Sequence, residues 1–386
     1  MTSTPGPTSV LLIAPLPPPR GGIPTWTEST LRWASQCENV RVDVVDTAPR
    51  RRPVYDQRRW RRVLWGIGQA WHDIGGVMRR LVRNPPDVVH LTTSGDLALA
   101  RDACVLLLTR LLRLRSLYHL HFGRLPATAA GRGIERAGFW ITLRLCDTVV
   151  VLDRAAAAAV AKICPSATAV LLPNFIDASV WSVSPTETSA STAPSPTATP
   201  RSPRILYVGW VIETKGVRDL VAACAGLAAR HEFELLVAGP SDPNFQSQLR
   251  ALAGPSAEWF RPIGEVPHED VRPLMAAADV FVLPSHSEGF PYVILEAMSM
   301  ARAIVATRVG AIPQMLSDDE GSAGELVPPR DIAALECALE RVLIDAALRD
   351  ALGRRARRIV ERRFTIEAVR DKYLNLWREE KPVPGA

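Results

Sequence analysis

The chain has 386 residues, of which 47% are apolar, and a formal net charge of +6. This length exceeds the size at which one hydrophobic core stops growing, and the apolar content is that of a folded globular protein, so two domains are expected. No apolar run approaches the ~20 residues of a membrane-spanning helix, and six cysteines without paired spacing argue against a disulfide framework or a zinc site and favour the reducing cytoplasm.

The first half of the chain alternates apolar runs of β character with stretches of helix length. This alternation is typical of a parallel sheet flanked by helices. The sequence predicts strands at residues 10–14, 40–45, 88–92, 116–120, 148–152 and 169–172. A doubly wound α/β domain is therefore expected over residues 1–177.

Two glycines, Gly21 and Gly22, lie in the loop between the first predicted strand and the helix that follows. Glycine lets the backbone approach a ligand closely, and a helix N-terminus offers amide groups to an anion. We therefore predict that both glycines bind substrate. An ordinary strand-to-helix turn is the alternative.

The segment from Arg50 to Arg83 holds ten arginines against two aspartates, and so accounts for the basic excess of the chain. Its apolar side chains recur in steps of four and three, which places them along one face of a helix: Trp60, Leu64, Ile67, Trp71, Ile74, Met78 and Leu81. Arginine and tryptophan on such a helix suit an anionic membrane, so a peripheral contact at the cytoplasmic membrane face is one expectation. A domain helix with a solvated basic face is the alternative. Nucleic acid is not an expected partner, because nothing here resembles a recognition helix.

Histidines stand at the end of the fourth predicted strand, where His119 and His121 flank Leu120. Ligands of open parallel sheets bind at this edge, so one of the two is predicted to reach the ligand. His121 is favoured because it leads into a glycine-containing loop. A packed structural histidine is the alternative, and His90, which ends the third strand, is a weaker candidate.

A tract of Ser, Thr, Pro and Ala from 182 to 203 cannot build a core and predicts a linker, placed at residues 178–203. A second doubly wound domain is expected at 204–364. Its strands are predicted at 204–208, 232–238, 279–283 and 303–307, and basic residues 349–363 predict a helix. A last helix is predicted at the start of residues 365–386.

Two carboxylates, Glu288 and Glu296, lie eight positions apart after an apolar run that breaks at Pro284. The run predicts a buried strand and residues 292–300 predict a helix, so Gly289 falls in a strand-to-helix turn with amides free for phosphate. Glu288 would lie beside the phosphates, and Glu296, about two turns into the helix, would face another part of the ligand. This arrangement suggests a nucleotide-sugar. An ordinary helix start with a solvated Glu296 is the alternative.

Together with Ala303 to Pro313, this stretch resembles the C-terminal signature of glycosyltransferase family four. The resemblance covers nearly the whole chain, and it is strongest from 204 to 313. It implies the GT-B fold, in which two Rossmann-like doubly wound α/β domains face each other across a cleft and the C-terminal helix returns to the N-terminal domain. It also implies transfer of a sugar with retention of anomeric configuration.

The resemblance assigns roles to particular residues. Lys215 would stabilise the departing diphosphate, Glu296 would hold the ribose hydroxyls, Glu288 would hold sugar hydroxyls and support the oxocarbenium-like centre, and His121 would orient the sugar. Further substrate-binding residues are predicted along the nucleotide and the helix start: Trp210, Gly264, Val266, Gly289, Phe290, Pro291 and Val293. Many relatives carry an arginine where this chain has Trp210, which removes one phosphate-binding group.

The expected partners are a nucleotide-sugar donor, bound mainly by the C-terminal domain, and a glycan, lipid-linked or polysaccharide-precursor acceptor, bound mainly by the N-terminal domain. No cofactor and no metal are expected, since no Asp-x-Asp follows a strand in the first half. A non-catalytic sugar-nucleotide-binding or scaffold subunit is the main alternative, supported by Trp210. An epimerase of the same fold would need further acid and base groups.

Overall fold

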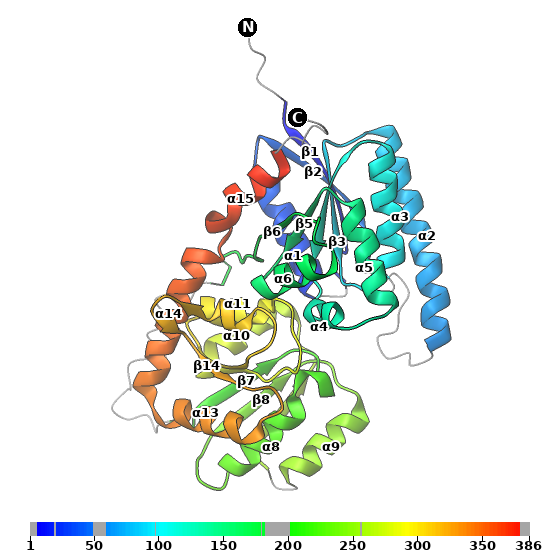
Figure 1. Ribbon diagram of the computed structural model, residues 1–386. Coiled ribbons are helices and arrows are strands. Elements are labelled where there is room, and N and C mark those ends of the chain that lie inside the picture. Colours follow the sequence, from blue (N-terminus) through cyan, green and yellow to red (C-terminus); the bar gives the residue numbers. More distant parts are fainter. Residues whose placement is uncertain are drawn as a thin grey trace. The chain divides into compact units, whose positions relative to one another are not determined.

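The computed structural model describes residues 6–18, 21–48, 59–96, 98–178, 180–181, 201–254 and 257–378, with only the backbone described at 59–67. The chain divides into two compact units: Met1–Asn174 with Val369–Ala386, and Phe175–Ala368 (Figure 1). Most of the predicted linker, at 182–200, and the arginines from 50 to 58 lie outside the described residues. Within the described residues, no helix has both the length and the apolar content needed to cross a membrane.

The first unit contains a parallel sheet of six strands in the order β2-β1-β3-β4-β5-β6. Its elements before the C-terminal helix are β1 (Thr8–Ala14), α1 (Gly22–Ala34), β2 (Val40–Asp46), α2 (Arg59–Arg83), β3 (Val88–Thr93), α3 (Ala98–Leu111), β4 (Arg115–Leu120), α4 (Leu125–Ala130), α5 (Ile134–Leu145), β5 (Thr148–Val151), α6 (Arg154–Ile163) and β6 (Ala169–Leu171).

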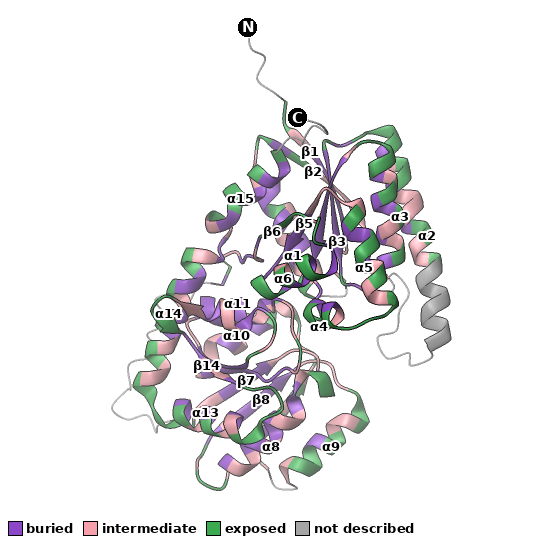
Figure 2. Cartoon of the chain, viewed as in Figure 1, coloured by how far each residue is buried: buried purple, intermediate pink, exposed green. Residues whose placement is uncertain are grey.

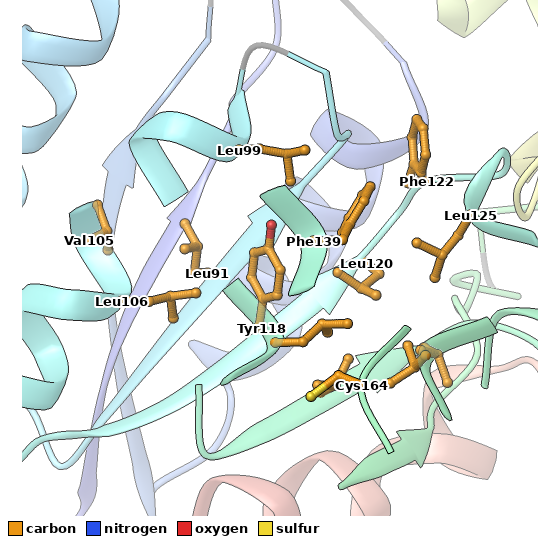
Figure 3. Packing of buried hydrophobic residues seen from close by; sticks show 14 of the residues in the cluster. Leu91, Leu99, Val105, Leu106, Tyr118, Leu120, Phe122, Leu125, Phe139 and Cys164 are labelled. Atoms are coloured by element: carbon orange, nitrogen blue, oxygen red, sulfur yellow. The ribbon is translucent and has the colours of Figure 1, made fainter. Parts of the chain in front are cut away.

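Strand side chains alternate between the two faces of this sheet, and both faces are covered. On one face, Leu11, Leu91 and Tyr118 join a buried cluster with residues of α2, α3 and α5, part of which Figure 3 shows. Their sequence neighbours Leu12, His90 and His119 are fully buried on the opposite face.

That opposite face packs against α1 and the C-terminal helix α15 (Ile366–Arg378). Trp26 of α1 donates from Nε1 to the Tyr373 hydroxyl of α15 at 2.9 Å, and Trp33 stacks on Trp377 with 5.5 Å between ring centroids. The last turns of α15 therefore complete the core of the first unit.

The second unit also contains a six-stranded parallel sheet, in the order β14-β11-β10-β7-β8-β9. Its elements are β7 (Arg204–Val208), the 3-10 turn η1 (Glu213–Lys215), α8 (Val217–Leu227), β8 (Glu234–Ala238), α9 (Pro243–Ala253), β9 (Phe260–Gly264), α10 (His268–Ala277), β10 (Val280–Leu283), α11 (Tyr292–Ser299), β11 (Ala303–Thr307), α12 (Ile312–Met315), β12 (Ser317–Asp318), β13 (Gly321–Ser322), β14 (Glu325–Val327), α13 (Ile332–Ile344) and α14 (Ala346–Arg363).

The predicted fold class is confirmed: both units are α/β with parallel sheets, and every predicted strand is present within two residues of its expected bounds. Four strands were not predicted: β12 and β13, which have two residues each and pair only with each other, and β9 and β14 of the six-stranded sheet. β9 contains Pro262 and Gly264, which interrupt a β pattern, and β14 has only three residues.

Of the seven residues in the predicted apolar face of α2, the side chains of Trp60, Leu64 and Ile67 lie outside the described residues, and the other four are not buried together. Ile74 and Leu81 pack into the core, but Trp71 and Met78 are 71% and 50% exposed. Val77, 0% exposed, supplies the inward contact instead, because it lies between Ile74 and Leu81 on the helix surface.

Candidate functional site

The order of strands in the second sheet identifies a point where the chain changes direction. From β7 the chain continues to β8 on one side, and from β10 it continues to β11 on the other, while β7 and β10 are neighbours. Ligands of open α/β sheets bind at the carboxyl ends of such a strand pair. The loops that leave β7 and β10 carry Lys215 and Glu288.

These two loops bring the predicted lysine and the first predicted glutamate together. Lys215 Nζ donates to Glu288 Oε1 at 2.7 Å, and the Ser285 hydroxyl donates to the same oxygen at 2.6 Å. The side chains of Lys215 and Glu288 are 27% and 10% exposed, so water screens this ion pair only in part. Nearby, burial and the charge of Glu288 raise the pKa of Tyr207, whose hydroxyl donates to the Trp210 carbonyl at 2.7 Å.

Glycines at Gly216 and Gly310 allow the loops to pack this closely. Gly216 has φ +69°, and a Cβ there would lie 1.9 Å from the Pro284 carbonyl oxygen. Gly310 has φ +54°, and a Cβ there would lie 2.2 Å from the carbonyl oxygen of Glu288. Neither position has room for a side chain, so the backbone around Glu288 is fixed from both sides.

Glu296 lies in α11, is 6% exposed and faces His268, the first residue of α10. Its Oε1 is 3.3 Å from His268 Nε2, and the edge of the His268 ring meets Trp181 at 5.6 Å between centroids. The alternative in which Glu296 is merely solvated is therefore wrong. The carboxylate is held in a largely buried position by a histidine.

The remaining predicted residues of the second unit surround α11 and the strand ends. Gly289 accepts from the Ala311 amide at 2.8 Å, Pro291 caps α11, and Phe290 is buried against Phe364. Val293 is half-buried in the first turn of the helix.

Trp210 is half-buried after β7, and Gly264 and Val266 are half-buried at and after the end of β9. Gly264 has φ +77° with no atom within 4 Å of an added Cβ, so its backbone conformation, and not crowding, favours glycine.

In the first unit, the switch point lies between β1 and β3. Gly21 and Gly22 are the N-cap and the first residue of α1, the helix that follows β1. Both glycines are exposed, and nothing lies within 4 Å of a Cβ added at Gly22. The structure therefore shows open space at this helix start, not a steric need for glycine.

His121 follows β4, with its backbone amide bound to the Thr93 carbonyl at 3.0 Å. It is half-buried, and its ring lies 4.1 Å from that of His119 and 5.2 Å from that of Trp26. Its Nε2 is buried without a hydrogen-bond partner. Of the two candidate histidines, His121 is thus the one with part of its surface accessible, because His119 is 0% exposed.

His90 and His119 form a buried chain with Trp377. The Trp377 indole donates to His90 Nδ1 at 3.0 Å, and His90 Nε2 lies 3.2 Å from His119 Nδ1. An indole can only donate, so His90 must donate from Nε2 to His119. Burial lowers the pKa of His90 to about 3, that of His121 to about 3 and that of His119 well below its usual value, so all three are neutral near pH 7.

Sequence reasoning missed Ser285, His268 and the contact between His286 Nε2 and Asp219 Oδ2 at 2.8 Å. Ser285 lies three residues before Glu288, a separation at which side chains in a tight loop can meet. His268 and Asp219 are 28 and 67 residues from their partners, and no local signal points to them. Among the described residues, no group of three or more His, Cys, Asp or Glu side chains could hold a metal ion.

Comparison with known proteins gives matches in both halves. Residues 20–180 match the family model described as Glycosyltransferase Family 4, and residues 202–345 match the model described as Glycosyl transferases group 1. The phosphatidyl-myo-inositol mannosyltransferase of Mycolicibacterium smegmatis is 34% identical over 198 residues, which are 50% of this chain and 48% of that protein. The chain spans about half the length of the curated relatives it matches.

Solved structures share the whole fold. Sucrose-phosphate synthase from Thermosynechococcus elongatus has a TM-score of 0.73 at 21% identity, covering 96% of this chain and 98% of that one. Anabaena HepE in complex with UDP-glucose has a TM-score of 0.70 at 17% identity, covering 95% and 98%. The likeness to these neighbours confirms the predicted GT-B fold.

Proposed function

Because the chain belongs to glycosyltransferase family 4, matched over residues 20–180 and 202–345, we propose that it is a retaining glycosyltransferase that uses a nucleotide-sugar donor. The observation that carries the proposal is the Lys215–Glu288 pair at the switch point of the second sheet. A cation and a carboxylate at this edge suit a ligand that carries both phosphate charge and hydroxyl groups.

The donor would lie along the start of α11. Lys215 and the amides of Gly289 and Phe290 would face the diphosphate, where the helix N-terminus adds partial positive charge. Glu288 would accept hydrogen bonds from sugar hydroxyls and support the developing positive charge at the anomeric carbon. Glu296 would accept from the ribose hydroxyls, and its burial against His268 supports a fixed orientation.

The base would lie near Gly264 and Val266, with the half-buried Trp210 at the phosphate side. Pro291 and Val293 complete the proposed donor subsite at the first turn of α11. Because Trp210 stands where many relatives carry an arginine, Lys215 is the side chain that we propose as the cation for the diphosphate.

The first unit is proposed to bind the acceptor, with His121 orienting the transferred sugar and Gly21 and Gly22 supplying backbone contacts. The acceptor is proposed to be a glycan, a lipid-linked sugar or a polysaccharide precursor. The name of the mycobacterial relative, a phosphatidyl-myo-inositol mannosyltransferase, supports the lipid-linked choice. A cytoplasmic site of action and a peripheral membrane contact through Arg50 to Arg83 remain part of this proposal.

Retention is proposed to follow from attack on the same face from which the diphosphate leaves, with the departing phosphate accepting the proton of the acceptor hydroxyl. This scheme needs no protein nucleophile. It also needs no metal, since Lys215 and the α11 amides would offset the phosphate charge.

A hydrolysis screen tests the enzyme proposal. The full chain is incubated with UDP-, GDP- and ADP-sugars, and the release of free nucleoside diphosphate is measured with and without EDTA. We expect slow release from one donor, unchanged by EDTA, with the first free sugar keeping the anomeric configuration of the donor by proton NMR. Binding of a donor without any release would instead support the non-catalytic alternative, for which Trp210 is the specific observation.

A matched pair of variants assigns the release to this site. Lys215→Ala should reduce the rate, because it removes the cation proposed to stabilise the leaving group. Arg218→Ala removes a nearby arginine that pairs with Glu213 at 3.0 Å, and should leave the rate unchanged. Equal rates for Lys215→Ala and the unaltered chain would reject the assignment.

A further inference from the structure

Three helices of the first unit, α2, α3 and α5, lie side by side over one face of its sheet (Figure 1). Helices in this position normally bury an apolar side and present a polar side to water. More than half of the large apolar side chains that are exposed in the described residues belong to these helices or their last turns. This concentration is unusual for a water-facing layer.

The central helix, α3, is apolar on both sides. Val105 and Leu106 are 0% exposed toward the sheet. Ala100, Cys104, Leu107 and Leu111 recur at steps of four and three, so they share one side of the helix, and all four are exposed. Leu107 and Leu111 are 47% and 71% exposed.

The flanking helices also carry exposed residues (Figure 2). On α2 the exposed apolar residues are Trp71, Met78 and Val82, at 71%, 50% and 67%. On α5 they are Ile134, Trp140 and Ile141, at 93%, 46% and 45%. We call the exposed residues of α2, α3 and α5 the three-helix face.

The acidic residues of these helices are buried or paired. Asp73 and Asp102 are 2% and 0% exposed, and both pair with Arg101. Glu135 is half-buried and accepts from the Thr128 hydroxyl at 2.8 Å.

Arginines, by contrast, are exposed on all three helices: Arg79 and Arg83 of α2, Arg110 of α3 and Arg144 of α5. Arg144 lies over the Trp140 ring, 5.1 Å from its centroid, and Arg110 donates to the Arg144 carbonyl at 3.2 Å. Among the described residues, the face therefore combines exposed apolar side chains with positive charge only.

We propose that the three-helix face lies on the surface of an anionic phospholipid membrane. Apolar side chains would enter the headgroup and acyl boundary, tryptophan would sit at the interface, and the arginines would contact lipid phosphates. Charge complementarity favours lipid over a second copy of the chain, because two copies of this face would bring arginines together. For α2 this inference rests on the membrane contact proposed above for Arg50 to Arg83, and it adds the surfaces of α3 and α5. It does not depend on which reaction the protein catalyses.

Vesicle binding of the full chain tests the proposal. We expect the protein to sediment with vesicles that contain phosphatidylglycerol, and much less with pure phosphatidylcholine. Leu107→Glu combined with Leu111→Glu should weaken binding by at least about tenfold, because two apolar side chains would be replaced by charges that the lipid repels. A matched control is Ile332→Glu with Ile344→Glu on α13, where both isoleucines are also exposed, and it should bind as the unaltered chain does.

The exposed cysteines offer a second readout. An environment-sensitive fluorophore on Cys104 should report an apolar surrounding when anionic vesicles are added, and one on Cys337, in the other unit, should not. Circular dichroism and thermal unfolding of the variants establish that they are folded.

The absence of binding to anionic vesicles at low salt would overturn the proposal, as would equal binding by the α3 and α13 variants. Sedimentation showing a dimer that only the α3 variant dissociates would overturn it too, in favour of an interface between copies.

Discussion

Lys215 and Glu288 form an ion pair, so a diphosphate would compete with a carboxylate for the lysine. Ser285 holds Glu288 Oε1 from the other side, which keeps the carboxylate in place when the lysine turns to another anion. At the scale of single residues, we therefore expect the charge on Glu288 to affect the affinity of Lys215 for an anion.

The motif Ser285 to Glu296 predicted two carboxylates as site residues, because both follow a strand at a fixed spacing, and these roles stay predictions. Their partners could not be predicted. Lys215 was expected to contact the diphosphate, and its direct pairing with Glu288 depends on two loops that are 73 residues apart and in contact through Gly216.

The buried histidines predict how stability depends on pH. Their pKa values in the folded protein lie below the usual 6.5, and that of His90 is lowered to about 3. At pH values between about 3 and 6.5, the unfolded chain therefore binds more protons than the folded one. The free energy of unfolding should therefore fall as the pH is lowered from about 6.5, by up to about 1.4 kcal/mol per pH unit for each such histidine.

Urea unfolding followed by tryptophan fluorescence at several pH values measures this slope. Asparagine does not titrate, so His90→Asn should show a smaller dependence of the free energy of unfolding on pH than the unaltered chain. Unfolding curves at about pH 8, where the histidines are neutral, measure the stability that the variant loses with the Trp377 contact. Equal slopes below pH 6.5 would contradict the assignment.

At the scale of elements, the strands were predictable because parallel sheets covered on both faces need continuous apolar runs. The side-chain directions of α2 were not, since its apolar residues are frequent enough to fit two faces. Helix α15 was expected to return to the first unit, but the contacts of Trp377 with His90, 287 residues away, are invisible to local patterns.

Ala301, which ends the turn after α11, should limit the stability of the second unit. It has φ +54°, where a residue with a Cβ is unfavourable. Ala301→Gly should raise the free energy of unfolding by about 0.5–1 kcal/mol.

Ala303→Gly is the matched control, because Ala303 lies in β11 and is 1% exposed. It should lower the free energy of unfolding, since glycine weakens strands and leaves buried space. Thermal unfolding of both variants measures the effect, and destabilisation by Ala301→Gly would contradict the strain argument.

At the scale of the whole molecule, each unit forms its own sheet with its own switch point, and each carries part of the predicted residue set. Alternating elements predicted two such units, and the family resemblance predicted their fold. The outward side of α3 was not anticipated, because an apolar residue in a sequence does not indicate whether it faces the sheet or the surroundings.

The central claim is that the Lys215–Glu288 pair forms the anion-binding part of a nucleotide-sugar site. Calorimetric titration of the full chain with UDP, GDP and ADP tests it through two variants with opposite expected signs. Glu288→Gln removes the competing carboxylate charge and should tighten binding of the preferred nucleotide, whereas Lys215→Ala should weaken it about tenfold or more, as expected for a lost hydrogen bond to a charged group. Changes of the same sign in both variants, or no change in either, would contradict the claim.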